Sequence, residues 1–80
     1  MGRDLYRKSE LEALAAKYAQ NVVTHKGFRP EDLPEIAQNQ EWKQARPGQR
    51  DKACRTIRDM ARALLIRAGY SRDIVYRNIP

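Results

Sequence analysis

The sequence predicts an all-α fold, a small bundle of about four helices. Apolar residues recur at helical spacing along most of the chain, whereas no alternating strand pattern is sustained and no Asn-Gly or Asp-Gly hairpin turn occurs. Turn-forming residues divide the chain into segments of helical length. The predicted helices cover residues 9–26, 32–44, 49–68 and 71–79, so that a basic and polar tail, 1–8, precedes a single helical domain, 9–80.

The first predicted helix has a start signal, an apolar stripe and a stop signal. Ser9 and Glu12 have the spacing of a capping box, in which each side chain satisfies the free backbone N–H of the other residue. The stripe consists of Leu11, Leu14, Ala15, Tyr18 and Val22. Gly27 is the predicted stop, because glycine adopts the left-handed cap conformation without penalty.

The second predicted helix begins with an acidic cap. Asp32 and Glu35 repeat the capping pattern, and Pro34 is tolerated only in a first turn. Trp42 does not continue the apolar stripe, because nine residues after Leu33 it points to the opposite side of a straight helix. Either the helix bends or ends near "QNQ", or Trp42 faces outward as a contact for a partner. We take an inward Trp42 on a bent segment as the default.

The break "RPGQ" precedes the longest predicted helix, about 30 Å in length. Its predicted inner face consists of Ala53, Ile57, Ala61, Leu64 and Ala68, widened by Met60 and Leu65. Arg55, Arg58 and Arg62 recur at spacings of three and four on a different face, a pitch that could follow a phosphate backbone. The alternative interpretation is a solvated face on which Arg55 pairs with Asp59.

The last predicted helix is short and has Ser71 as its cap. Three aliphatic residues are expected to face inward: Ile74, Val75 and Ile79. This arrangement leaves Arg72, Tyr76 and Arg77 exposed to varying degrees. The acid Asp73 either favours the helix N-terminus or pairs with Arg77 one turn later.

The distribution of charge points to a nucleic acid as the partner. The chain carries a net charge of +6 and has a pI near 9.9. Residues 1–40 hold six basic and six acidic residues, whereas residues 41–80 hold ten basic and four acidic ones, and eight of those ten are arginine. Arginine suits phosphate because its planar fork donates two hydrogen bonds at once. We expect phosphate contacts from Arg46, Arg50, Arg55, Arg58 and Arg62, and base reading from Arg72, Tyr76 and Arg77.

The stretch "GYSRDIVYR", residues 69–77, resembles the second half of helix-turn-helix domains of the resolvase and Fis-like kinds. The resemblance implies a turn glycine, a capped helix anchored by Val75, and exposed side chains at Arg72, Asp73, Tyr76 and Arg77 nearest DNA. Two features depart from the family pattern. Leu65 stands where such motifs place a small residue, and the preceding helix is longer than the first helix of the motif.

A second resemblance competes with the first. The stretch "RALLIRAGYSRDIVYRNI" is similar to the helical modules of RecX-type modulators of recombination filaments. This resemblance implies that the basic surface faces a protein–DNA filament instead of bare duplex DNA.

The residue inventory favours a binding protein over an enzyme. One His and one Cys cannot build a tetrahedral zinc site, and there is no phosphate-cradling glycine loop. We therefore expect no catalytic residues, cofactor or metal. The longest apolar run is four residues, "ALLI", so we expect a cytoplasmic protein without a membrane span.

Three functions remain open from the sequence. The first is a duplex DNA-binding regulator of transcription or an accessory factor of a mobile element, acting as a dimer because dimerisation would enlarge a small core. The second is an adaptor or inhibitor that docks an acidic protein through the same arginines, with Trp42 as an anchor. The third is an RNA-binding protein, against which the scarcity of exposed aromatic residues counts.

Overall fold

The structure is a computed structural model that describes residues 5–80, and this range is all-helical without a strand. The prediction of a small all-α bundle is therefore confirmed.

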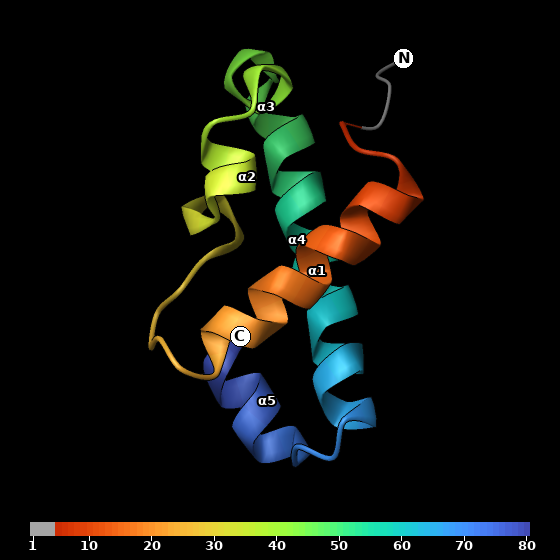
Figure 1. The fold of residues 1–80 in the computed structure, drawn as a ribbon, viewed down its shortest axis with the longest axis vertical. Coiled ribbons are helices and arrows are strands. Elements are labelled where there is room, and N and C mark those ends of the chain that lie inside the picture. Colours follow the sequence, from red (N-terminus) through yellow and green to blue (C-terminus); the bar gives the residue numbers. More distant parts are fainter. Residues whose placement is uncertain (1–4) are drawn as a thin grey trace.

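The elements are α1 (Lys8–Val22), the 3-10 helix η1 (Pro30–Asp32), α2 (Pro34–Ala37), α3 (Gln40–Gln44), α4 (Pro47–Arg67) and α5 (Arg72–Asn78). Helix α1 crosses α4, α2 and α3 lie beside the first half of α4, and α5 turns back beside the end of α1 (Figure 1).

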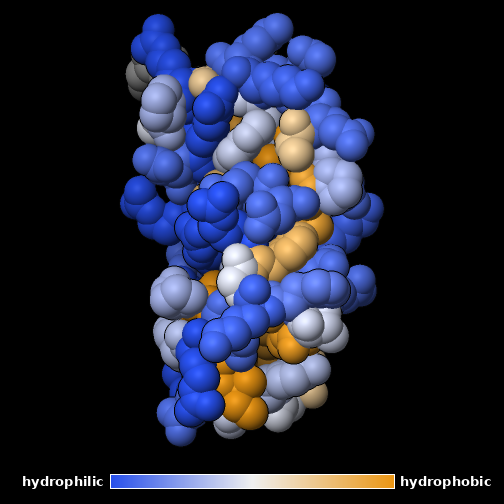
Figure 2. Space-filling view, turned by 90° about the vertical axis from the view of Figure 1, so that its left-hand side faces the viewer, coloured by the Kyte–Doolittle hydropathy of each residue, from blue (hydrophilic) through white to orange (hydrophobic). Residues whose placement is uncertain are grey.

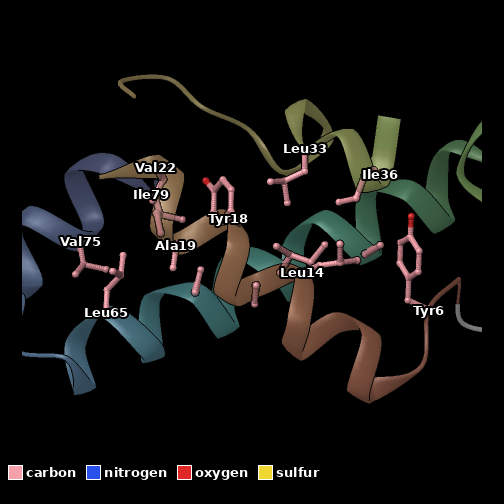
Figure 3. Close-up of a cluster of buried hydrophobic side chains, with 14 residues drawn as sticks. Tyr6, Leu14, Tyr18, Ala19, Val22, Leu33, Ile36, Leu65, Val75 and Ile79 are labelled. Carbon is pink, nitrogen blue, oxygen red and sulfur yellow. The ribbon is translucent and has the colours of Figure 1, made fainter. Parts of the chain in front are cut away.

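The core lies where α1 crosses α4, and it extends to both ends of the molecule (Figure 3). At one end Val22 of α1 meets Leu65, Val75 and Ile79, and at the other end Leu14 lies with Leu33, Ile36 and Tyr6. Ala15, Ile57 and Ala61 are completely buried at the crossing, where small side chains allow two helices to approach closely. The predicted apolar stripe of the first helix is confirmed, although Leu11 is only half-buried.

Helix α1 begins one residue earlier than predicted, at Lys8, and its N-cap is Arg7 instead of Ser9. The backbone N–H of Arg7 donates to Glu10 Oε1 at 2.9 Å, which makes Arg7 the N-cap. With this start, Tyr6 and Leu11 occupy the N′ and N4 positions of a hydrophobic staple, whereas a cap at Ser9 would leave no apolar pair there. Tyr6 is 6 % exposed and belongs to the core although it falls in the predicted tail 1–8, of which residues 1–4 lie outside the described range.

Helix α1 also ends before the predicted position. The last helical residue is Val22, and Gly27 lies beyond it with a φ of +79°. Around this end the side chain of Asn21 donates to the Lys17 carbonyl and the Thr24 hydroxyl donates to the Asn21 carbonyl. Polar side chains that bind nearby backbone groups compete with the helical ladder, which accounts for the early end.

The predicted second helix, 32–44, is in fact three short pieces. Leu33 is extended, with φ −67° and ψ 130°, because the residue before a proline is disfavoured in the helical region. Asp32 accepts from the backbone N–H of Arg29 and thus belongs to the first turn of η1, so the predicted Asp32 and Glu35 cap is wrong. The expected break near "QNQ" is confirmed, since Asn39 is extended and its side chain accepts from Trp42 N to start α3.

Helices α4 and α5 match the prediction to within two residues at each end. Pro47 is the first residue of α4, where its fixed φ is favourable. At the other end the N–H of Tyr70 donates to the Leu65 carbonyl and the N–H of Gly69 to the Ile66 carbonyl, both at 3.0 Å. These two bonds form a Schellman motif, which requires the left-handed conformation that Gly69 adopts with φ +106°. Ser71 Oγ then accepts from Ile74 N at 3.3 Å, as predicted for the cap of α5.

Three residues predicted to face inward are exposed. Leu64 and Ala68 of α4 point away from the core, because Leu65 fills the inner position where α5 packs. Ile74 is 44 % exposed, because Val75 and Ile79 lie one turn apart and define the buried side of α5, about 100° from Ile74.

Candidate nucleic-acid interface

The arginine stripe of α4 consists of residues with different exposure. Arg55, Arg58 and Arg62 follow one side of the helix at spacings of three and four. Arg55 is exposed, whereas Arg58 and Arg62 are half-buried. The stripe therefore offers one fully solvated guanidinium and two that lie partly against other elements.

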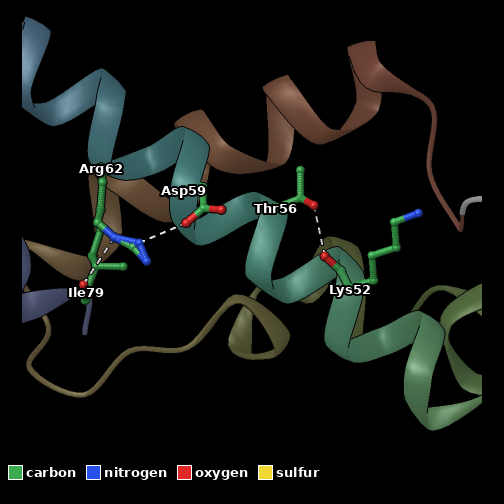
Figure 4. Close-up of polar contacts among 5 residues, drawn as sticks. All are labelled: Lys52, Thr56, Asp59, Arg62 and Ile79. Atoms are coloured by element: carbon green, nitrogen blue, oxygen red, sulfur yellow. Dashed lines mark hydrogen bonds and ion pairs between the residues drawn. The ribbon is translucent and has the colours of Figure 1, made fainter.

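Arg62 connects α4 to α5 through three contacts. Its guanidinium donates to Asp59 Oδ1 at 3.0 Å and to the Ile79 carbonyl at 3.4 Å, as drawn in Figure 4. It also lies 5.4 Å from the ring centroid of Tyr76, within cation–π range. Asp59 pairs with Arg62, not with Arg55 as the alternative interpretation of the sequence expected. Arg62 thus places the stripe of α4 and the side of α5 that carries Tyr76 on one surface.

Arg58 lies at the edge of the core beside Tyr18. Burial raises the pKa of the Tyr18 hydroxyl, and the neighbouring Arg58 guanidinium opposes this rise by charge and hydrogen bonding. A positive charge beside a buried phenol lowers the free energy of the ionised form and therefore acts against desolvation. Arg58 itself is half-buried, so only part of this residue faces solvent.

Helix α5 presents a basic and aromatic face to solvent. Arg72 and Tyr76 are one turn apart on the side that meets Arg62, while Asp73 and Arg77 are one turn apart on the outer side. All four are exposed, and 53 % of Tyr76 is accessible in spite of its contact with Arg62. We call Arg55, Arg58, Arg62, Arg72, Tyr76 and Arg77 together the arginine surface.

Figure 2 shows the face of the molecule that carries α2 and α5. Strongly hydrophilic side chains run along one edge of this face for most of its length, and apolar side chains show between and below them. The apolar residues exposed around α5 include Leu64, Tyr70 and Ile74.

Arg46 and Arg50 lie at the other end of α4, apart from the arginine surface. Arg46 is the N-cap of α4 and is an exposed residue. Arg50 donates to the carbonyls of Trp42 at 2.9 Å and Lys43 at 2.7 Å, which are among the last carbonyls of α3. The sequence predicts both arginines as phosphate contacts, but Arg50 serves as a cap for α3.

Trp42 is half-buried and packs against the core, which agrees with the default interpretation of the sequence. The guanidinium of Arg50 lies over its indole ring, 5.7 Å from the centroid. With Arg50 over the ring and the core against it, the indole has little free surface as an anchor for a partner. The sequence gave no sign of this contact, because the seven residues between Trp42 and Arg50 include the turn between two helices.

The single thiol is buried and carries no sign of activation. Burial, together with nearby Glu31, raises the pKa of Cys54 to about 11, and Cys54 Sγ lies 3.9 Å from Glu31 Oε1. A nucleophilic cysteine has a lowered pKa instead. Within residues 5–80, no group of three or more His, Cys, Asp or Glu side chains is placed to hold a metal ion.

Comparison of the chain with protein-family models, curated proteins and solved structures found no significant match. None of the helices within residues 5–80 is long and apolar enough to cross a bilayer.

Proposed function

We propose that this protein binds duplex DNA through the arginine surface. The observation that supports the proposal is the contact between Arg62 and Tyr76, which brings the arginine stripe of α4 next to the side of α5 that carries Arg72 and Tyr76. This surface holds five arginines, with Asp59 and Asp73 as the acids on the same helix faces, and Asp59 is already paired with Arg62. Such a basic surface attracts a polyanion and supplies planar donors for its phosphates.

The proposed binding mode assigns different tasks to the two helices. Helix α5 is the only part of the arginine surface that projects with most of its side chains in solvent, so it is the element that enters the major groove. Arg55, together with the accessible parts of Arg58 and Arg62, contacts phosphates of the flanking backbone. The Schellman turn at Gly69 fixes the angle between the two helices, in accordance with the resemblance of residues 69–77 to a helix-turn-helix.

A salt titration tests this proposal directly. The fluorescence anisotropy of a labelled random-sequence duplex is measured against protein concentration at about 50 and 200 mM salt. With roughly three phosphate contacts, affinity should fall on the order of 40-fold over this range. Absence of duplex binding at the lower salt concentration contradicts the proposal.

Single substitutions locate the binding surface. Arg55→Ala should weaken binding and lower the slope of log affinity against log salt by about 0.9, because it removes one phosphate contact. Arg72→Ala and Arg77→Ala should weaken binding through the loss of contacts in the groove. Lys8→Ala is the matched control, because Lys8 is an exposed cation of α1 outside the arginine surface. An equal loss with Lys8→Ala would show that only overall charge matters.

A competition experiment separates duplex DNA from the other polyanions that the sequence leaves open. Unlabelled single-stranded RNA should displace the duplex poorly, because among the described aromatic residues only Tyr70 and Tyr76 are well exposed for stacking on bases. More effective displacement by RNA than by duplex DNA would identify RNA as the ligand.

A further inference from the structure

The outer side of α5 carries one acid and one base. Val75 and Ile79 are buried and define the inner side of the helix, where Figure 3 shows them among the core side chains. At about 100° per residue, Asp73 and Arg77 each lie about 120–160° around the helix from both of these positions. Both residues are exposed. Asp73 and Arg77 are therefore the side chains of α5 that point most directly away from the core.

Arg72 and Tyr76 lie on the flank of α5 that faces the arginine stripe of α4. At about 100° per residue they are within about 100° of the two buried positions, and Tyr76 contacts Arg62. When α5 lies in the major groove, this flank faces the DNA strand that the stripe contacts, whereas the outer side faces the base edges. A recognition helix contacts bases through its N-terminal residues, and Asp73 is the second residue of α5. Asp73 is therefore placed to reach a base.

The carboxylate of Asp73 is unpaired. Within the residues that the structure describes, its side chain takes part in no hydrogen bond or ion pair, and the pair with Arg77 one turn later is not formed. A negative charge beside phosphates raises the free energy of the complex with any DNA sequence. This cost is offset only where the DNA offers a hydrogen-bond donor to the carboxylate. The donors in the major groove are the exocyclic amino groups of cytosine and adenine.

We propose that Asp73 determines the sequence specificity of the arginine surface by accepting a hydrogen bond from cytosine N4, an inference that rests on the proposed function. Adenine fits less well, because its N7 acceptor lies beside the N6 donor and suits an amide better than a carboxylate. Arg77, about 6 Å further along the helix, then donates to O6 and N7 of a guanine. Sites without the cytosine leave the carboxylate desolvated and unpaired, so Asp73 selects by rejecting them.

The test begins with a duplex library that has about eight randomised central base pairs, from which the wild-type protein selects sites at about 50 mM salt. Fluorescence anisotropy then compares a selected site with duplexes in which one C·G pair is replaced by T·A or by A·T. We expect the wild type to prefer the C·G pair by about tenfold or more at one position. The T·A duplex places the O4 acceptor and the methyl group of thymine where the cytosine donor was.

Two variants of Asp73 and a matched control complete the design. Asp73→Ala should bind random-sequence duplex at least as tightly as the wild type, but its preference for C·G should fall below about twofold. Asp73→Asn should prefer A·T at the same position, because an amide pairs with N6 and N7 of adenine. Glu12→Ala removes an exposed carboxylate of α1 outside the arginine surface and should keep the preference for C·G. Circular dichroism verifies that each variant is folded.

Several outcomes would overturn the inference. A wild type that binds duplex DNA without a preference for C·G would overturn it and leave the proposed function intact. An unchanged preference in Asp73→Ala and Asp73→Asn would show that the acid serves only the N-terminus of α5, and the thermal stability of the two variants would then be the only property to fall. Equal loss of preference with Glu12→Ala would assign the effect to overall charge. Absence of binding to any duplex contradicts the proposed function itself.

Discussion

Helix α4 carries an arginine over an aromatic ring near each end, and the two pairs differ in what the arginine does. Arg50 lies 5.7 Å from the ring centroid of Trp42 and donates to two carbonyls of α3, so its donors face the protein. Arg62 lies 5.4 Å from the ring centroid of Tyr76, which stays about half exposed beside further arginines. The number of arginines in a basic helix therefore overestimates its binding surface, because some of them cap or join neighbouring helices.

The largest effect should come from removing Arg50. Arg50→Ala leaves carbonyls at the end of α3 without their charged donor and uncovers Trp42, so we expect a loss of about 2 kcal/mol in the free energy of unfolding. Urea denaturation followed by tryptophan fluorescence measures this loss. Arg55→Ala, at an exposed position five residues further along α4, should change stability by less than about 0.5 kcal/mol. Equal stability of the two variants would contradict a capping role for Arg50.

Replacement of Arg62 should affect stability less but DNA binding more. Arg62→Ala removes the pair with Asp59, the bond to the Ile79 carbonyl and the contact with Tyr76, for an expected loss of about 1 kcal/mol. The same variant should weaken duplex binding at low salt, whereas Arg50→Ala should leave binding unchanged under conditions in which it is folded. Thermal unfolding measures the stability of both variants, and fluorescence anisotropy measures their affinity for duplex DNA. If the variant that loses more stability also loses more affinity, the assigned roles are contradicted.

Tyr76 offers a finer test of the second pair. Tyr76→Ala removes the ring under Arg62 and should cost roughly 0.5–1 kcal/mol, while Tyr76→Phe keeps a ring there and should be close to neutral. Chemical denaturation of the two variants gives the difference in stability. If Tyr76→Phe weakens duplex binding as much as Tyr76→Ala, the hydroxyl and not the ring contributes to binding.

The smallest effect at neutral pH should come from the ionisation of two buried groups, the Cys54 thiol and the Tyr6 hydroxyl. Burial raises the pKa of Cys54 from 9.0 to about 11 and that of Tyr6 from 10.0 to about 12. Because the folded state favours the protonated forms, their contribution is complete below pH 9 and is lost as the pH rises from about 9 to 12. Unfolding free energies at pH 8 and pH 10.5 should therefore decrease less steeply for Cys54→Ala than for the wild type. An identical decrease would show that the thiol is not protected.

The periodic features of the sequence predict the core well. The stripe from Leu14 to Val22 and the inner positions Ile57, Ala61 and Val75 are buried as predicted, because a 3.6-residue period reports directly on the side of a helix that packs. The local signals are weaker. Two capping patterns overlap at the start of α1, and the buried Tyr6 favours the earlier one, which depends on tertiary packing that the sequence does not display.

The sequence predicts which residues of the candidate site are exposed better than it predicts what each arginine contacts. The exposure of Arg55, Arg72 and Arg77 follows from their places on amphipathic helices. The contact between Arg50 and the end of α3, and that between Arg62 and Tyr76, join residues 7 to 14 positions apart across turns. Neither helical periodicity nor charge reports on such contacts, and therefore the sequence could not separate structural arginines from exposed ones.

The short elements between α1 and α4 have a consequence for how the molecule opens and closes. Helices of three to five residues are far below the length at which an isolated helix persists, so η1, α2 and α3 depend on the packed pair of α1 and α4 for their order. Amide hydrogens in this connecting region should exchange with solvent through local openings, whereas those in the middle of α4 exchange only when the whole domain unfolds. Helices α4 and α5 would then stay folded and packed during the local openings of η1, α2 and α3.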